Sequence, residues 1–406
     1  MNSTEASSFV INDNFFEYIK NNISCKDTSK LLLKKENVEF DKKFAITQIE
    51  CRNKFKTKIP EILSNQFFLF PKMICGEQCT HELVAKLHAS LFNRGDVVLD
   101  MTMGLGVDSY YISKVAKSVT SIECDKDIAL INQMNYRDMA PNINLLNDNS
   151  IEYISNRKER YSAIFIDPAR RDANNKRMFG FHDCVPDVID LMPHFKRCTD
   201  RLIVKASPML DISKSLEELC YVTDIWIVAI KNSCKELLFV LDFTKEERLG
   251  NVRIHTIDYE VTTQCFDFFV EPASDFGCIA ASDDVSAGTV LLEPNACIIK
   301  SGRTESLITA FESLKKLEKN SHLFVSKCVV KDFPGRQFII EDVIPFKDKN
   351  LRKFKEYKTL NVSTRNFRLS ADQLKARIGV IDGGDKYLFG TTLSNSQQVL
   401  ILCRKA

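Results

Sequence analysis

Residues 97–108 read VVLDMTMGLGVD, and this segment decides the fold of the central part of the chain. A short β-branched run ends in Asp100, and Gly104 and Gly106 follow before a helical pattern begins. Glycines suit such a loop because the backbone can turn sharply and approach a ligand without an intervening Cβ. A dinucleotide fingerprint would need a third glycine at position 109, where the chain has Ser109. By itself, the segment is equally compatible with a structural glycine turn.

Short β-branched runs alternate with helical stretches after Gly95, which predicts a parallel, doubly wound α/β sheet. The expected strands are 97–99, 119–122, 143–146, 163–166, 202–204, 225–230 and 237–243. Residues 231–236 between the last two runs are too few for a helical crossover and enough for a hairpin loop. We therefore expect a Rossmann-like sheet of seven strands with the last strand antiparallel. This arrangement is typical of class I methyltransferases, whereas dinucleotide dehydrogenases continue with parallel strands.

Polar side chains at the ends of successive strands predict a cofactor site, because open α/β sheets bind ligands at the carboxyl ends of their strands. Glu123 could accept hydrogen bonds from two ribose hydroxyls, and Asp148 from an adenine amino group. Together with the glycine loop they favour S-adenosylmethionine. The expected cofactor-binding residues are Asp100, Thr102, Gly104, Gly106, Asp108, Glu123, Cys124, Asp148 and Asn149. The alternatives are a solvated strand-end acid at Glu123 and a helix cap at Asp148.

The fourth expected strand runs directly into Asp167 and Pro168, beside the place where a methyl acceptor would enter. Asp167 could hold an N–H donor so that the nitrogen lone pair points at the sulfonium. Arg170 and Arg171 could bind the phosphates of a nucleic acid, since guanidinium groups match that geometry. These four residues are the candidate catalytic set, and surface ion pairs are the alternative for the arginines. Lys205 could line the same mouth, although a loop lysine is most often solvated.

The bulk composition is that of a soluble protein with several domains. The 406 residues exceed the roughly 250 to 300 at which one hydrophobic core stops growing. No apolar run is long enough to span a bilayer, and the N-terminus does not resemble a secretory signal, so we expect no membrane partner and a cytoplasmic location. The 14 cysteines and 6 histidines show no metal-ligand spacing, which favours reduced thiols and no metal site.

The flanking regions are expected to form three further parts. Helical spacing continues to about Leu91, with Thr80 placed to cap the last of these helices. A β-rich stretch around 254–270 and an amphipathic helix over 303–317 predict a small α+β domain. The last segment contains a basic stretch, Lys347 to Arg377, a helix capped by Ser370, and strands near 387–391 and 399–403.

Taken together, the motifs resemble those of bacterial RNA methyltransferases that carry a ferredoxin-like insert and a C-terminal THUMP-like domain. The resemblance extends from about Glu77 to the end of the chain. It rests on the motifs Glu77-Gln78 with Thr80 and Glu82, Asp100 to Asp108, Asp167 to Arg171, Glu293 to Ala296, Phe333 to Arg336, and Gly383 to Asp385. The core is also distantly similar to the cap trimethylguanosine synthases. The helical spacing predicts an N-terminal helical region at 1–94, and the resemblance implies a methyltransferase core at 95–245, an α+β ferredoxin-like domain at 246–328 and a THUMP-like domain at 329–406.

THUMP domains bind structured RNA, so the resemblance implies an RNA partner, either tRNA or rRNA. The basic stretch suits phosphate contacts mixed with aromatic stacking. Its candidate contact residues are Phe354, Tyr357, Arg365, Phe367 and Arg368. A solvated charged face is the alternative.

The leading hypothesis is an S-adenosylmethionine-dependent methyltransferase that acts on structured RNA. A non-catalytic RNA-binding or assembly factor that retains the fold is a second hypothesis, and a methyltransferase for a small molecule or protein is a third. The target nucleotide, the methylated atom and the oligomeric state do not follow from the sequence.

Overall fold

The computed structural model describes residues 10–170, 180–245, 252–260, 262–270 and 279–406. The chain divides into two compact units. Unit 1 comprises Met1–Ala206, Ser213–Val222 and Leu238–Arg248. Unit 2 comprises Ser207–Ile212, Thr223–Leu237 and Leu249–Ala406.

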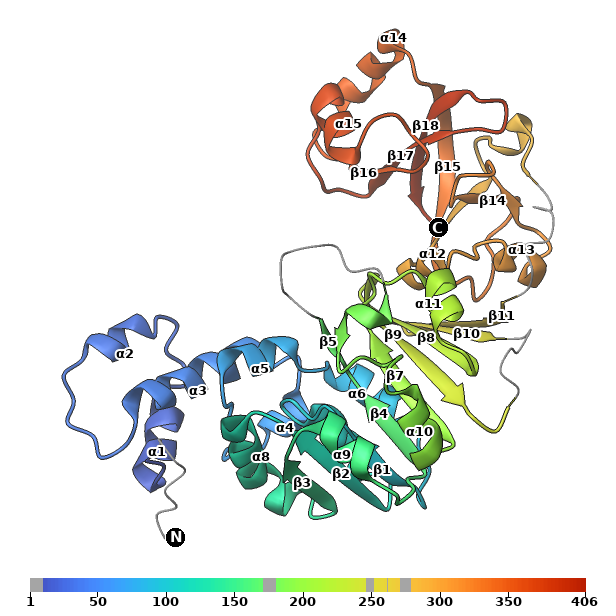
Figure 1. Ribbon diagram of the computed structural model, residues 1–406. Coiled ribbons are helices and arrows are strands. Elements are labelled where there is room, and N and C mark those ends of the chain that lie inside the picture. Colours follow the sequence, from blue (N-terminus) through green and yellow to red (C-terminus); the bar gives the residue numbers. More distant parts are fainter. Residues whose placement is uncertain (1–9, 171–179, 246–251, 261, 271–278) are drawn as a thin grey trace. The chain divides into compact units, whose positions relative to one another are not determined.

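Helices α1 to α6 precede the first strand of unit 1 (Figure 1). They are α1 (Asp13–Asn22), α2 (Ser29–Leu33), α3 (Lys42–Phe55), α4 (Pro60–Leu63), α5 (Met73–Gln78) and α6 (Glu82–Ser90). Phe55 and Phe70 share a buried core with Met103, Leu105 and Tyr136. The second half of this helical region therefore packs against the glycine loop.

The expected cap of α6 is wrong by one residue. His81 is the N-cap of α6, and its ring nitrogen accepts a hydrogen bond from the backbone N–H of Leu83. The Thr80 hydroxyl donates to a carboxylate oxygen of Asp108. The hydroxyl of the buried Thr80 thus bonds to a carboxylate 28 positions away in the sequence and not to the free amides at the start of the helix.

The largest sheet confirms the predicted Rossmann-like architecture. Its strands run in the order β11-β10-β8-β9-β7-β4-β1-β2-β3. The seven predicted strands are β1 (Val97–Asp100), β2 (Ser118–Glu123), β3 (Ile143–Asn147), β4 (Ala163–Ile166), β7 (Arg201–Ala206), β8 (Val222–Ile230) and β9 (Ser233–Asp242). The pairs β1/β2, β2/β3, β1/β4 and β4/β7 are all parallel.

The connection between β8 and β9 is the predicted hairpin, although it is shorter than expected. Only Lys231 and Asn232 separate the two neighbouring strands, and both residues have positive φ angles, 51° and 56°. A two-residue loop with this backbone is the turn that joins antiparallel strands, so the last strand is antiparallel.

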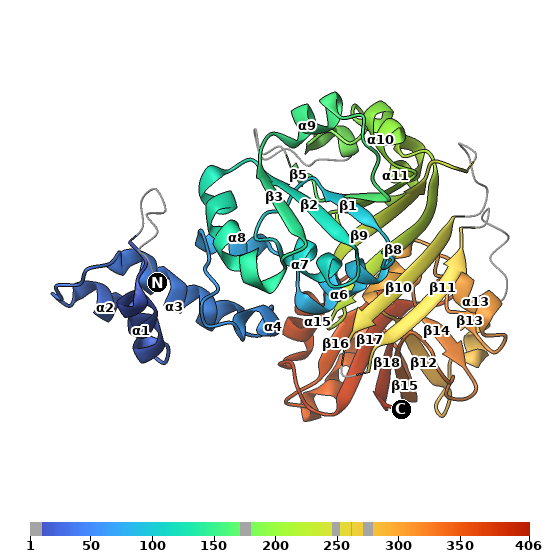
Figure 2. The same cartoon turned by 90° about the horizontal axis from the view of Figure 1, so that it is seen from below.

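Helices cover both faces of the strands of unit 1, as a doubly wound sheet requires (Figures 1 and 2). One layer contains α6, α7 and α8, and the other contains α9 and α10. The new members are α7 (Val107–Ser113), α8 (Lys126–Met139), α9 (Ser150–Asn156), α10 (Met192–Cys198) and α11 (Ile212–Glu218). The strands β1, β2, β3, β4 and β7 pair in parallel, so all five end at the same edge of the sheet.

The β-rich stretch near 254–270 extends the larger sheet, and this corrects the expectation that it belongs to the α+β domain. Strand β10 (Arg253–Tyr259) pairs in parallel with β8, and β11 (Gln264–Phe269) pairs antiparallel with β10. An unpaired edge of β8 would leave a row of backbone groups without partners, and β10 fills that edge.

Unit 2 also contains a seven-stranded sheet with the order β13-β14-β12-β15-β18-β17-β16. Its strands are β12 (Val290–Pro294), β13 (Lys315–Lys316), β14 (Phe324–Ser326), β15 (Gly335–Pro345), β16 (Asn361–Thr364), β17 (Lys386–Thr392) and β18 (Gln398–Lys405). Its helices are α12 (Ala296–Ser301), α13 (Ser306–Ala310), α14 (Asp348–Leu351) and α15 (Ala371–Ile378). The two predicted C-terminal strands and the Ser370 cap of α15 are confirmed.

The predicted helix over 303–317 is much shorter in the structure. Helix α13 ends at Ala310, and Lys315 and Lys316 pair with Val325 and Phe324 of β14. Strand pairing therefore determines the structure of the second half of the segment, despite its helical periodicity.

The helices in the described part of the chain are all too short or too polar to cross a bilayer.

Candidate functional site

The two glycines of the loop after β1 have different environments. Gly104 has a φ of +54°, and a Cβ added there would meet nothing within 4 Å. Gly106, the N-cap of α7, has a φ of +80°, and a Cβ would come within 2.5 Å of the Tyr136 ring and 2.8 Å of Met103. Gly106 is therefore required by packing, whereas Gly104 borders open space that a ligand can enter.

Asp100 lies beneath this loop and is 1% exposed. Its carboxylate accepts hydrogen bonds from the backbone N–H of Thr102 and from the Ser109 hydroxyl. Burial raises the pKa of Asp100 to about 7, against the lowering effect of these two hydrogen bonds. Thr102 in turn accepts a hydrogen bond from the backbone N–H of Asp167 at 2.7 Å. These two residues tie the loop to the ends of β1 and β4, and Asp100 does not face open space.

Glu123 ends β2 directly beside the loop. Its two carboxylate oxygens accept hydrogen bonds from the backbone N–H groups of Gly104 at 3.0 Å and Asp125 at 2.8 Å. Each oxygen keeps a lone pair for a further donor. Cys124 is exposed next to it, and burial together with the Glu123 charge raises the pKa of the Cys124 thiol. Asn132, which no local sequence motif identifies, donates to the carbonyl oxygen of Gly104 at 2.6 Å and fixes the loop from α8.

Asp148 and Asn149 follow β3 and have separate roles. The side chain of Asn149 caps α9 by accepting from the backbone N–H of Ile151. Asp148 is exposed, and one of its oxygens accepts from the backbone N–H of Asn149 at 2.7 Å. The helix cap considered for Asp148 is thus made by its neighbour, which leaves an exposed carboxylate at the end of β3.

The Asp108 carboxylate is held by hydrogen bonds within the protein, and its expected contact with the cofactor stays a prediction. His88, which is fully buried, shares a hydrogen bond of 2.7 Å with Asp108, and the Thr80 hydroxyl donates to the other carboxylate oxygen. Burial opposes ionisation of Asp108, but His88, Lys205 and these hydrogen bonds outweigh it and lower the pKa of Asp108 to about 2.

Asp167 lies immediately after β4 and pairs with a lysine of the next strand. The Nζ of Lys205 donates to Asp167 Oδ2 at 2.7 Å and to the Thr80 hydroxyl oxygen at 2.9 Å. Lys205 is 9% exposed, whereas the Asp167 side chain is 39% exposed. Lys205 therefore lies beside Asp167, and the alternative of a solvated loop lysine is wrong because residue 205 belongs to β7 and its ammonium group is buried among acceptors.

The remaining residues of the candidate catalytic set are only partly described. Pro168 leads into the two-residue strand β5 (Ala169–Arg170), which pairs antiparallel with β6 (Cys184–Val185). The side chain of Arg170 and the whole of Arg171 lie outside the described residues. Their proposed phosphate contacts therefore stay a prediction.

Comparison with known proteins identifies both the fold and the C-terminal domains. A crystal structure of a candidate methyltransferase from Porphyromonas gingivalis W83 superposes with a TM-score of 0.86 and 27% identity, and the match covers 97% of this chain and 98% of that protein. Residues 291–334 match a ferredoxin-like domain family, and residues 335–405 match the THUMP domain-like family. This chain has a methyltransferase fold with ferredoxin-like and THUMP-like domains.

A curated relative gives a shorter match. An uncharacterized RNA methyltransferase from Mycoplasma mobile is 30% identical over 86 residues, which span 20% of this chain and 23% of the relative. The chain thus matches about a quarter of that protein. The family matches also refine the expected domain bounds, because the THUMP-like match begins at Gly335 and the ferredoxin-like match ends at Pro334.

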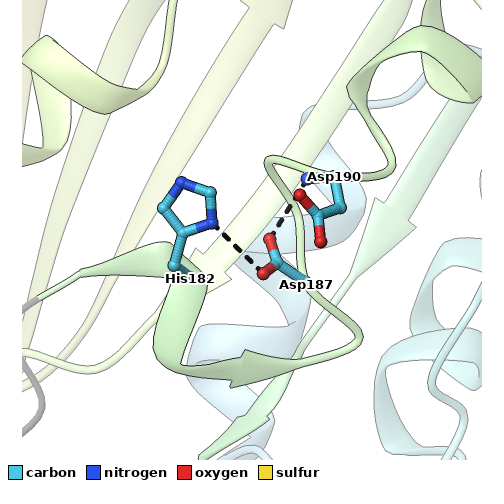
Figure 3. Close-up of side chains that lie close together, drawn as sticks. All are labelled: His182, Asp187 and Asp190. Carbon is cyan, nitrogen blue, oxygen red and sulfur yellow. Dashed lines mark hydrogen bonds and ion pairs between the residues drawn. The ribbon is translucent and has the colours of Figure 1, made fainter.

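One group of potential metal ligands occurs among the described residues, at His182, Asp187 and Asp190 (Figure 3). The ring of His182 lies 3.2 Å from Asp187 Oδ2, while Asp187 Oδ1 accepts from the backbone N–H groups of Ile189 and Asp190. His182 and Asp190 are both exposed. Hydrogen bonds within the protein account for both oxygens of Asp187, so this arrangement is explained as a turn.

Proposed function

We propose that this chain is an S-adenosylmethionine-dependent methyltransferase that acts on structured RNA, either tRNA or rRNA. The observation that carries the proposal is the row of groups at the ends of β1, β2, β3 and β4. Gly104 borders open space, Glu123 lies against it, Asp148 presents an exposed carboxylate, and Asp167 follows at the next strand end. Open α/β sheets bind their ligands at this edge.

The residues present fit the cofactor. Glu123 would accept from the ribose hydroxyls, Asp148 would accept from the adenine amino group, and the backbone at Gly104 would border the amino acid moiety. When bound, the cofactor supplies an electrophilic methyl group on a sulfonium. The buried Ser109, which bonds to Asp100 and Ser121, leaves no glycine approach for a dinucleotide pyrophosphate. Asp100 and Asp108 would act by holding the loop rather than by touching the cofactor.

Asp167 would position the methyl acceptor. One of its oxygens is engaged by Lys205, and the partly exposed side chain can accept an N–H of the acceptor with its free lone pairs. Fixing that N–H aims the nitrogen lone pair at the methyl group, and correct orientation lowers the barrier of a displacement reaction.

Support for RNA comes from the THUMP-like match and from an exposed basic segment within it, residues 347–358. This segment carries six cationic and two acidic side chains, a net charge of +4 against +2 for the whole chain. All six cations are exposed. They are Lys347, Lys349, Arg352, Lys353, Lys355 and Lys358. Such a concentration of positive charge favours a phosphate backbone as partner.

Two of the contact residues expected for RNA are corrected by the structure. Phe354 is 1% exposed and belongs to a hydrophobic core, so its ring cannot stack on a base. Arg365 donates to the buried carboxylate of Glu293 at 2.9 Å. The structure thus excludes base stacking by Phe354, and the proposed RNA contact relies chiefly on the exposed cations, which would contact phosphates.

Calorimetry tests the cofactor. The wild-type protein should bind S-adenosylmethionine and not NADH, and Gly104→Arg should abolish binding because its side chain would fill the open space beside the loop. Tight NADH binding would refute the assignment.

Mass spectrometry of nucleosides tests the acceptor. A modified nucleoside should be missing from RNA of a strain without the gene and should return when that RNA is incubated with the protein and S-adenosylmethionine. Asp167→Ala should bind the cofactor and fail to restore the modification. Unchanged RNA modification together with RNA binding would favour the non-catalytic factor, and cofactor binding without RNA binding would favour a small-molecule or protein substrate.

A further inference from the structure

Lys205 is a buried cation next to the proposed acceptor site, and strand register explains its position. The pairing of β4 with β7 runs from Ile164/Leu202 to Ile166/Val204. The next residue of each strand is Asp167 and Lys205, so the two side chains are brought together by the parallel register. Thr80, which is 125 positions away in sequence, completes the contact from the N-terminal region.

The surroundings of Lys205 give its ammonium group a specific set of acceptors. Besides Asp167 and Thr80, the Asp108 carboxylate lies 4.0 Å away. His88 holds the other oxygen of Asp108, so four residues from three separate segments fix the lysine. Burying an ammonium group costs free energy unless the group is paired. An apolar side chain would fill the same space without that cost, so packing alone does not explain a lysine at this position.

The residues around Lys205 differ in how much of each side chain is exposed to solvent. Asp108, Thr80 and Lys205 are almost fully enclosed, whereas Asp167 reaches the surface with part of its carboxylate. Asp167 is therefore the member of this group that is most accessible to a substrate. Because Lys205 occupies Oδ2, the orientation of the remaining lone pairs is set by the lysine.

We propose that Lys205 is a positioning residue that fixes the Asp167 carboxylate as a hydrogen-bond acceptor for an amino N–H of the methyl acceptor. This inference rests on the proposed function and narrows the acceptor to an exocyclic amino group. A carboxylate that is paired with a cation is a weak base, so it suits holding an N–H better than removing a proton before attack. The amino nitrogen donates its lone pair to the methyl carbon, the carbon–sulfur bond breaks with its electrons going to sulfur, and the new ammonium releases a proton to water.

A double-mutant cycle in methyl transfer tests whether Lys205 acts through Asp167. The probe is total RNA from a strain lacking the gene, with S-adenosylmethionine as donor. Lys205→Met should lower kcat by roughly 10- to 100-fold while cofactor affinity stays within about twofold, because orientation and not binding is lost. In an Asp167→Asn background the same change should cost nothing further, within about twofold. Lys205→Arg should recover part of the rate, and exposed Lys158→Met is the matched control.

Two results of that cycle would overturn the proposal: losses that multiply in the double variant, or a parallel fall in cofactor affinity for Lys205→Met. Methylation of a ring carbon or of a ribose hydroxyl, as seen in the product nucleoside, would also contradict it.

Thermal melting of the wild type, Lys205→Met, Asp167→Asn and the double variant tests the pairing without a measurement of activity. Asp167→Asn removes one carboxylate from a buried ammonium and should lower Tm. Adding Lys205→Met should then raise Tm by about 2–4 °C relative to Asp167→Asn alone, because the unpaired charge is gone. Additive Tm shifts would refute the pairing whatever the activity. If the wild-type protein methylates no RNA, the proposed function fails, while the melting cycle still decides whether Lys205 and Asp167 are coupled.

Discussion

Charged side chains are mostly buried and hydrogen-bonded in the strand-end site of unit 1, whereas they are exposed in the basic segment 347–358 of unit 2. In the strand-end site, Asp100 and Lys205 are buried, the Asp108 side chain is 13% exposed, and each of the three has hydrogen-bond partners within the protein. In the basic segment the cations are exposed, and the one ion pair found for them in the described residues joins Lys353 and Asp342 at 3.6 Å. Burying a charge costs desolvation free energy and requires hydrogen-bond or ion-pair partners, whereas an exposed charge stays hydrated and requires no partner.

The two regions therefore support functional conclusions of different precision. A paired buried charge restricts the geometry around it, so the strand-end site supports specific roles for single residues. An exposed lysine does not fix the geometry of its surroundings. The basic segment therefore indicates a class of partner, a phosphate backbone, without assigning a contact to any single residue.

The two loop glycines should respond differently to the same substitution. Gly106→Ala should lower the free energy of unfolding by about 3 kcal/mol, because a left-handed backbone costs about 1–2 kcal/mol and the clash with Tyr136 adds about 1–3 kcal/mol. Gly104→Ala should cost only the backbone share, about 1–2 kcal/mol. Urea unfolding of both variants measures this, and equal losses would show that the packing difference does not matter.

Glu123 should dominate cofactor affinity. Glu123→Ala should weaken S-adenosylmethionine binding by about 100-fold, since it removes a charged acceptor for two hydroxyls and the anchor of the Gly104 N–H. Glu123→Gln should lose roughly tenfold because the amide oxygen still accepts. Calorimetry measures both, and the exposed acid Asp127→Ala, four positions on, is the control that should bind normally.

Asp100 should make stability fall with rising pH. The folded pKa of about 7 lies above the ordinary value of 3.8, so between these two values the folded state holds a proton that the unfolded state has released. Stability therefore declines as the pH rises from about 4 to 7. Asp100→Asn should flatten this decline and stabilise the protein on the order of 2 kcal/mol at pH 8. Thermal melts between pH 5 and 8 measure the effect, and an unchanged pH slope would contradict it.

The basic segment should contribute a modest, salt-sensitive share of RNA binding. Lys349→Glu combined with Lys355→Glu should weaken binding to total tRNA about tenfold and reduce the slope of log affinity against log salt by about 2. Fluorescence anisotropy at several salt concentrations measures both quantities. Lys126→Glu combined with Lys158→Glu, two exposed lysines of unit 1, is the matched control. Equal losses in the two pairs would mean that only net charge matters.

Much of the larger sheet was predictable because its signals are local. The glycine loop, the β-branched runs and the short β8/β9 connection each occupy a few consecutive residues, and together they predict the strands, their parallel pairing and the antiparallel last strand, whereas the order of the strands comes from the structure. The helix expected over 303–317 failed because pairing with β14 overrides a helical period. The assignment of β10 failed because sequence does not show that β8 has an open edge.

The candidate site was predictable by position and not by partner. Asp100, Asp108, Glu123, Asp148 and Asp167 all lie in the strand-end region, as expected from the rule for open sheets. Sequence could not distinguish Asp108, which is turned to His88 and Thr80, from Asp148, which is exposed. Nor did it show that Lys205 is buried, since the register of β4 and β7 is a long-range property.

The fold class and the residues that end each strand could be predicted from the sequence, because strand ends and glycine turns are encoded within short windows. The tertiary structure alone decided which charged groups are free and which are held. Asp167 and Lys205 are 38 positions apart, and Thr80 and Lys205 are 125 apart, yet they form one hydrogen-bonded group. Burial turns such distant residues into partners, because an unpaired charge inside the protein would cost more than the fold can bear.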